Sequence, residues 1–253
     1  MATREPGIRV FEDREALSQA AATEFADACK NAVSVRGRFL VALSGGGTPL
    51  ELYRWLSRAP YRNEIEWGSL HVFWGDERCV PFDDPESNYG QARDAFLSQV
   101  PVPPQNVHPV RTELEPEQAA DDYALLLKQY AIAPLDWPRF DLVLLGVGED
   151  GHAASLFPGS AVRAGRAVLA VTGRYQDRPT RRVTLTPLVF NSARKVVFLV
   201  SGAAKAKIVA DILQGKRRPA KIPAQRIRPA DGAVTWLLDR AAAAEITGIG
   251  NEE

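Results

Sequence analysis

Three short apolar runs in this chain each end in a polar loop that contains glycine. The strands expected from these runs span residues 38–43, 70–74 and 141–145, and the loops begin at Ser44, Gly75 and Gly146. Short apolar runs bounded by glycine are typical of buried strands. Ligands of open α/β sheets bind just beyond the carboxyl ends of the strands, so these loops are the first candidates for a functional site.

The rest of the chain alternates between strand-like and helix-like patterns. Further strands are expected over residues 167–171, 182–185, 195–200 and 234–238, with an alanine-rich helix after the last of them. Helices are expected over residues 16–33, 49–57, 89–98, 116–130 and 203–213. This alternation predicts an α/β fold in which residues 1–253 form a single domain. Its sheet is mainly parallel and Rossmann-like, with helices on both faces.

Charge and cysteine content exclude several classes of protein. Lys and Arg together number 31, as do Asp and Glu, so the molecule has no net field that would favour nucleic acid. Two cysteines, Cys29 and Cys79, are too few for a disulfide framework or a cluster of metal ligands. No apolar run approaches the roughly 18 residues of a membrane span, and the N-terminus lacks a signal core. We therefore expect a cytoplasmic protein with no membrane or nucleic-acid partner. The oligomeric state is left open, and a monomer is plausible.

The third loop carries the residues best suited to proton transfer. Glu149, Asp150 and His152 follow the strand at 141–145, and His152 is one of only three histidines. His71 lies inside a predicted strand and is interpreted as a core or edge residue. His108 lies in a proline-rich segment and is expected to be exposed.

The same loop also reads as G-x-G-x-x-G over residues 146–151. A dinucleotide site needs a long helix directly after that motif, and Pro158 and Gly159 interrupt any such helix. The dinucleotide interpretation is therefore rejected.

The first loop has the composition of a phosphate cradle. Ser44 is followed by Gly45, Gly46 and Gly47, and then by Thr48. Glycines let backbone N–H groups turn toward an anion, and a helix N-terminus behind them favours phosphate. We expect Pro49 at the first helical position, with Thr48 as the N-cap and Glu51 completing a capping box.

A nucleophilic serine is the alternative for this loop. Ser44 with Asp141 or Asp150 and His152 has the chain order of a Ser–acid–His triad. A nucleophile elbow turns directly from its serine into a helix, whereas the expected helix starts at Pro49, five residues later. Direct attack by water is therefore favoured over a covalent serine mechanism.

The second loop places two acids and an arginine after the strand at 70–74. Asp76, Glu77 and Arg78 follow Gly75, and Ser87, Asn88 and Tyr89 come eleven residues later. The guanidinium of Arg78 offers a rigid fork of donors for an oxyanion or phosphate. A local ion pair on an exposed loop is the simpler alternative.

Four segments together resemble 6-phosphogluconolactonases: LSGGGTP (43–49), GDERCVPFDDPESNY (75–89), LLGVGEDGHAASLFPGS (144–160) and the segment 181–206. The resemblance spans nearly the whole chain. The similar glucosamine-6-phosphate deaminases carry Asp-Glu-Tyr in the second segment, where this chain has Arg78. Two departures from the family pattern are small. Ala153 stands where threonine is more common, and residues 82–86 contain no histidine.

The resemblance implies an α/β enzyme of the oxidative pentose phosphate pathway. It would hydrolyse 6-phospho-D-glucono-1,5-lactone to 6-phospho-D-gluconate, with no cofactor and no metal. His152 would be the general base that activates water, without a covalent intermediate. Asp76 and Arg78 would belong to the active site, with Arg78 a candidate for stabilising the oxyanion. Asp76, Glu149 and Asp150 are all candidates for orienting His152.

The substrate phosphate would rest on residues 44–48. Lys205 and Arg182 would add positive charge there, and Asn88 would support the site.

Two other functions are weighed against hydrolysis. Arg78 argues against a deaminase, and the presence of both His152 and Asp76 argues against a non-catalytic sugar-phosphate sensor.

Overall fold

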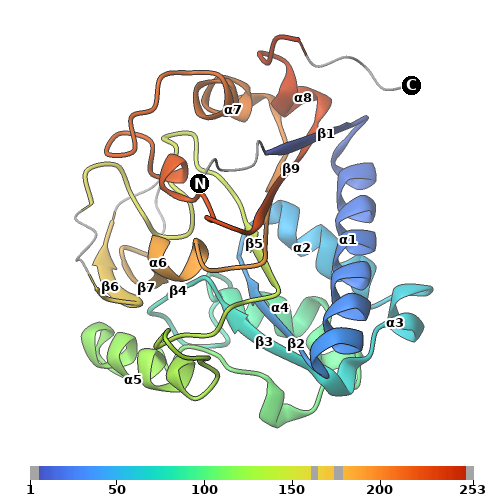
Figure 1. Ribbon diagram of the computed structural model, residues 1–253, viewed down its shortest axis with the longest axis vertical. Coiled ribbons are helices and arrows are strands. Elements are labelled where there is room, and N and C mark those ends of the chain that lie inside the picture. Colours follow the sequence, from blue (N-terminus) through green and yellow to red (C-terminus); the bar gives the residue numbers. More distant parts are fainter. Residues whose placement is uncertain (1–5, 161–164, 174–178, 249–253) are drawn as a thin grey trace.

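The computed structural model describes residues 6–160, 165–173 and 179–248. Its main sheet is parallel throughout, with the strand order β1-β9-β8-β5-β2-β3 (Figure 1). In that order the strands are β1 (Gly7–Phe11), β9 (Ala233–Asp239), β8 (Lys195–Val200), β5 (Leu142–Leu145), β2 (Phe39–Leu43) and β3 (Leu70–Trp74). The predicted parallel sheet is confirmed. Its edge strand β1 was not predicted.

Helices cover both faces of this sheet, as predicted (Figure 1). Phe39, Val41 and Leu43 of β2 pack into the core formed with α1 (Arg14–Arg36), α2 (Gly47–Leu56) and α4 (Asn88–Ala95). The alternate residues Leu40 and Ala42 belong to the core formed with α5 (Pro116–Lys128) and α7 (Ala206–Leu213). The strand is buried on both faces because successive side chains point to opposite sides. The shorter helices are α3 (Tyr61–Glu64), α6 (Pro187–Phe190) and α8 (Arg240–Ala243).

A second, antiparallel sheet lies beside the first and was not predicted. It has the order β4-β7-β6, with β4 (Asp76–Arg78), β7 (Arg181–Leu185) and β6 (Val168–Thr172). Val183 and Leu185 of β7 share one apolar core with Phe73 of the parallel sheet. The start of the second loop, Asp76–Arg78, is therefore a strand, and its pairing with β7 fixes the backbone of all three residues. The assignment of residues 1–253 to one domain stays a prediction.

The first turn of α2 differs from the expected capping box. The helix begins at Gly47, and its N-cap is Gly46, whose φ of 107° suits glycine. No side chain caps this helix end. Instead, Thr48 Oγ1 shares a hydrogen bond of 2.7 Å with Ser201 Oγ. The predictions of Thr48 as N-cap and Pro49 as first helical residue are therefore wrong, and no side chain in the described part of the chain caps the first N–H groups of α2.

His108 is buried rather than exposed, which corrects the sequence prediction. Its ring stacks on Phe73 with 4.5 Å between centroids, and its Nε2 lies 3.4 Å from Nδ1 of His71. The backbone N–H of His108 also donates to Val72 O, which fastens the proline-rich segment to β3. Burial first, and then the facing His71, together lower the pKa of His108 to about 4. Burial and then Arg38 lower the pKa of His71.

We expect this histidine pair to make the fold sensitive to acid. A lowered pKa in the folded state means that the unfolded state binds more protons below the ordinary histidine pKa. The contribution of each histidine to the free energy of unfolding is present at neutral pH. For His108 it is lost as the pH falls from about 6.5, the ordinary histidine pKa, toward 4. For His108 alone the loss at pH 5 is about 2 kcal/mol. Burial of Glu77 raises the pKa of that carboxyl to about 7, which acts in the opposite direction over the same range.

Because these two groups act in opposite directions, the effect of His108 is measured by comparing the wild type with a variant that lacks this histidine. Urea denaturation at pH 7 and pH 5 should show a smaller loss of unfolding free energy in His108→Gln than in the wild type. An equal loss in both proteins would show that His108 does not titrate on unfolding.

No helix in the described ranges is long and apolar enough to cross a membrane.

Candidate active site

A cavity of about 340 Å³ lies beyond the carboxyl ends of β2, β5 and β8. It gathers predicted residues from all three loops and from two later segments. Those that line it are Ser44, Gly45, Gly46, Gly47, Thr48, Asp76, Arg78, Asn88, His152, Arg182 and Lys205. Glu149 and Asp150 do not line the cavity, but each contacts a residue that does. The sheet therefore brings together residues that are up to about 160 positions apart in the chain.

His152 is held by a tight turn and by Asp150. The N–H of Gly148 donates to the carbonyl of His152 at 2.9 Å, and Gly151 has a φ of 82°. The Nδ1 atom of His152 lies 2.6 Å from Asp150 Oδ1, which also accepts the backbone N–H of His152 at 3.1 Å. Burial would raise the pKa of Asp150, but its hydrogen bonds to His152 outweigh burial and hold that pKa below the ordinary value. Among the three candidate acids, Asp150 is thus the one placed to orient the imidazole.

Asp76 is buried and takes a hydrogen bond from a residue that the sequence analysis missed. Its Oδ2 accepts from Ser155 Oγ at 2.6 Å, and Ser155 itself is fully buried. The backbone N–H of Ser155 donates to Thr184 Oγ1 of β7. This serine therefore ties the loop that carries His152 to the sheet that carries Asp76. A buried serine in an Ala-Ser-Leu-Phe segment gives no sequence signal of this role.

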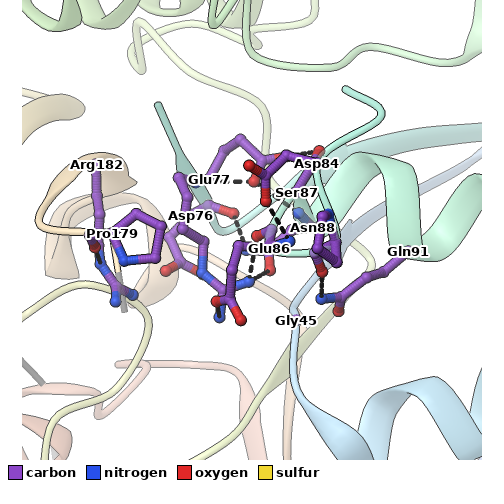
Figure 2. Close-up of polar contacts among 12 residues, drawn as sticks. Gly45, Asp76, Glu77, Asp84, Glu86, Ser87, Asn88, Gln91, Pro179 and Arg182 are labelled. Atoms are coloured by element: carbon purple, nitrogen blue, oxygen red, sulfur yellow. Dashed lines mark hydrogen bonds and ion pairs between the residues drawn. The ribbon is translucent and has the colours of Figure 1, made fainter. Parts of the chain in front are cut away.

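Arg78 is fixed by hydrogen bonds rather than by a short ion pair. Its Nη1 donates to Asn88 Oδ1 at 2.6 Å and to the carbonyl of Glu86 at 2.7 Å. The amide of Asn88 in turn donates to the carbonyl of Asp76 at 2.7 Å, as Figure 2 shows. Arg78 is directly opposite Arg182 in the β4–β7 pair, and both line the cavity. The guanidinium of Arg182 also lies over the ring of Phe157.

Glu77 belongs to the same group of polar contacts (Figure 2) but does not line the cavity. Its carboxylate accepts the backbone N–H groups of Arg78, Asn88 and Tyr89 at 2.7–2.8 Å. Burial raises its pKa, and these N–H donors act against that rise. Because two of the donors open α4, Glu77 joins the start of that helix to β4. The role of Glu77 is therefore to position Arg78 and Asn88.

The other side of the cavity is positively charged. The uncapped N-terminus of α2 lies there with Thr48 and Ser201, whose hydroxyls share a hydrogen bond. Lys205, the N-cap residue of α7, has its Nζ 3.8 Å from Glu149 Oε1. Arg14, from the first turn of α1, also lines this side. The sequence analysis missed Arg14, since it lies outside every motif. Such a combination of cations and free helix N–H groups is suited to an anion.

Residues 12–236 match the family described as glucosamine-6-phosphate isomerases/6-phosphogluconolactonase. The chain belongs to this family.

Relatives in the glucosamine-6-phosphate isomerase/6-phosphogluconolactonase family match over almost their full length. A 6-phosphogluconolactonase of Synechocystis sp. is 40% identical over 240 residues, which cover 94% of this chain and 97% of the relative. A 6-phosphogluconolactonase of Nostoc sp. is 37% identical, covering 95% of this chain and 98% of the relative. The solved structure of 6-phosphogluconolactonase from Trypanosoma brucei matches with a TM-score of 0.85 and 32% identity. That match covers 97% of this chain and all of the other.

The structure bears on two alternative interpretations of the glycine loops, a dinucleotide site at residues 146–151 and a nucleophilic Ser44. Residues 146–160 contain turns and an isolated bridge but no helix, which agrees with rejecting a dinucleotide site. The hydroxyl of Ser44 donates to the carbonyl of Gly45 at 3.2 Å, and the backbone of Ser44 is held by Tyr53 Oη. The helix begins three residues after Ser44 rather than five, so the distance argument against a nucleophile elbow is weaker than the sequence indicated.

Proposed function

We propose that this chain hydrolyses 6-phospho-D-glucono-1,5-lactone to 6-phospho-D-gluconate, a reaction of the oxidative pentose phosphate pathway. One observation carries the proposal. A single cavity is lined by an imidazole that a carboxylate holds from outside the lining, by a buried arginine, and by a helix N-terminus flanked by lysine. The names of the relatives at up to 40% identity support a phosphorylated lactone as the substrate.

His152 serves as the general base. A δ-lactone is an activated ester, so the enzyme needs to position water, remove its proton and stabilise the carbonyl oxygen. An imidazole nitrogen can accept the water proton and later return it, and histidine is the side chain that most often serves as a general base. We assign proton transfer to Nε2, because Asp150 lies on Nδ1, where its carboxylate stabilises the imidazolium that forms. The water oxygen bonds to C1 while the carbonyl π electrons move onto the carbonyl oxygen, which becomes an oxyanion. When the C=O bond re-forms, the bond from C1 to the ring oxygen breaks, and the proton returns from His152 to the departing ring oxygen.

Arg78 stabilises the oxyanion. Arg78 is only 5% exposed, and its Nε has no hydrogen-bond partner among the described residues. Asn88 and the carbonyl of Glu86 fix its direction before substrate arrives. A fixed charge in a site of low dielectric stabilises a developing anion without reorganising. Asp76 lies beside it and is held by Ser155, in position to bind a hydroxyl of the sugar.

The phosphate binds at the N-terminus of α2, with Lys205 and Arg182 as its cations. Phosphate remote from C1 then supplies binding energy that positions the lactone for attack. Water attacks directly, and Ser44 contributes its backbone to the shape of the loop. The proposal is tested by acid release from freshly generated 6-phosphogluconolactone, measured above the spontaneous rate, with glucosamine 6-phosphate as the control. Lactone turnover without ammonia release supports hydrolysis, and the reverse pattern would assign the deaminase reaction.

Lys205→Ala is expected to weaken use of the phosphorylated lactone selectively. A charge-assisted contact to a phosphate is worth roughly 1.5–3 kcal/mol, or about 10- to 150-fold in kcat/KM. Gluconolactone, which lacks the phosphate, should be affected little. The two enzymes and two substrates form a cycle that isolates the contact. Lys207→Ala, an exposed change in the same helix, is the matched control. An equal loss on both substrates would show that Lys205 serves stability or the carbonyl end instead.

A further inference from the structure

Arg14 lies where the N-termini of two helices meet the cavity. It is the first residue of α1, directly after Asp13, whose carboxylate caps the helix by accepting the N–H of Ala16 at 2.8 Å. The Arg14 side chain lines the cavity. Its Nη1 lies 3.7 Å from the position that a Cβ on Gly47 would occupy, so the guanidinium lies against the first residue of α2.

The charge of Arg14 is not balanced within the described part of the chain. The other three cations that line the cavity have polar partners: Asn88 for Arg78, the carbonyl of Pro179 for Arg182, and Glu149 for Lys205. Arg14 makes no ion pair or hydrogen bond with any residue in the described ranges. It therefore contributes no polar contact to the fold.

The position is also electrostatically unfavourable for a cation. The first turn of a helix carries the positive end of the helix dipole, which disfavours arginine there. Arg14 stands in the first turn of α1 and beside the first turn of α2. An anion on the free N–H groups of α2 would relieve this repulsion and give the guanidinium a partner. A phosphate fits best, because a guanidinium can bind two of its oxygens at once.

We propose that Arg14 is a specificity-determining residue that binds the phosphate of the substrate from the α1 side. This inference rests on the proposed function, since it assigns the phosphate to the N-terminus of α2. Arg14 is exposed to solvent at the edge of the cavity. In the proposed complex its guanidinium would cover the face of the phosphate that otherwise contacts water. Arg14 and Lys205 would then hold the phosphate from two different helices.

The test compares Arg14→Ala and Arg14→Lys with Arg62→Ala, which removes an exposed arginine outside the cavity. With the phosphorylated lactone, Arg14→Ala should raise KM by about tenfold with a small change in kcat. Arg14→Lys should recover part of the loss. With gluconolactone, all variants should stay within about twofold of the wild type. Tm of Arg14→Ala should not fall, because the arginine opposes the helix dipole. An unchanged KM, or equal losses on both lactones, would overturn the assignment.

Inorganic phosphate separates this inference from the proposed function. Calorimetric titration should show phosphate binding to the wild type and to Arg62→Ala, and about tenfold weaker binding to Arg14→Ala. If phosphate binding depends on Arg14 but the wild type does not hydrolyse the lactone, the proposed function fails and the role of Arg14 stands. If the wild type hydrolyses the lactone while phosphate binds Arg14→Ala equally well, the role of Arg14 fails and the proposed function stands.

Discussion

Replacing His152 with alanine is expected to lower kcat by at least about 100-fold, the low end for the loss of a general base. The imidazole is the group in the cavity whose second nitrogen is held by a carboxylate, at 2.6 Å from Asp150. The side chain is partly exposed and lies at the end of a tight turn, so its removal should leave the fold intact. The measurement is acid release from the phosphorylated lactone, with near-UV circular dichroism to monitor the fold.

Asp150→Asn tests whether the carboxylate orients the base. An amide keeps the size of the side chain but removes the charge that stabilises the imidazolium, so kcat should fall by less than in His152→Ala. A His152→Ala enzyme with near-normal turnover would remove His152 from the chemistry. Loss of activity in Asp150→Asn alone would assign the base to another residue.

A methyl group at Gly45 is expected to lower kcat/KM by about 100-fold without unfolding the protein. Its Cβ would lie 1.8 Å from Asn88 Oδ1, the atom that accepts from Arg78. The amide of Asn88 must then move, which breaks its contacts to Arg78 and to the carbonyl of Asp76. Losing a charge-assisted hydrogen bond and a neutral one costs roughly 2–4 kcal/mol, which sets the expected size of the effect. Steady-state kinetics of Gly45→Ala on the phosphorylated lactone measures it.

Gly68→Ala is the matched control for that change. An added Cβ at Gly68 meets no atom within 4 Å, and the residue lies outside the cavity. Both variants should unfold cooperatively at similar temperatures, and only Gly45→Ala should lose activity. Normal kinetics in Gly45→Ala would mean that Arg78 does not depend on Asn88 for its position.

Much of the site could be predicted from the sequence because parallel strands carry their loops to one edge. Ser44, Asp76 and His152 each come within seven residues after the end of a strand of the parallel sheet, and all three line the cavity at that edge. The capping of α2 could not be predicted in the same way. The hydroxyl of Thr48 could have bound a backbone N–H of its own helix, as a capping box requires. It contacts Ser201 instead, a residue more than 150 positions away.

The sequence analysis missed the residues whose positions depend on contacts between distant parts of the chain. Ser155 acts through Asp76, Arg14 reaches the cavity from the first turn of α1, and His108 is buried by stacking on Phe73. None of these contacts leaves a local pattern in the chain. The strand β4 is only three residues long and polar, so neither periodicity nor hydrophobicity marks it as a strand.

The most direct test of direct attack by water is the kcat of Ser44→Ala, measured beside His152→Ala on the same substrate. Ser44 Oγ donates only to the carbonyl of Gly45 among the described contacts, so its loss should leave kcat within about tenfold of the wild type. His152→Ala should fall by at least about 100-fold. A Ser44→Ala enzyme as inactive as His152→Ala would contradict hydrolysis by a His152-activated water and would establish Ser44 as a covalent nucleophile.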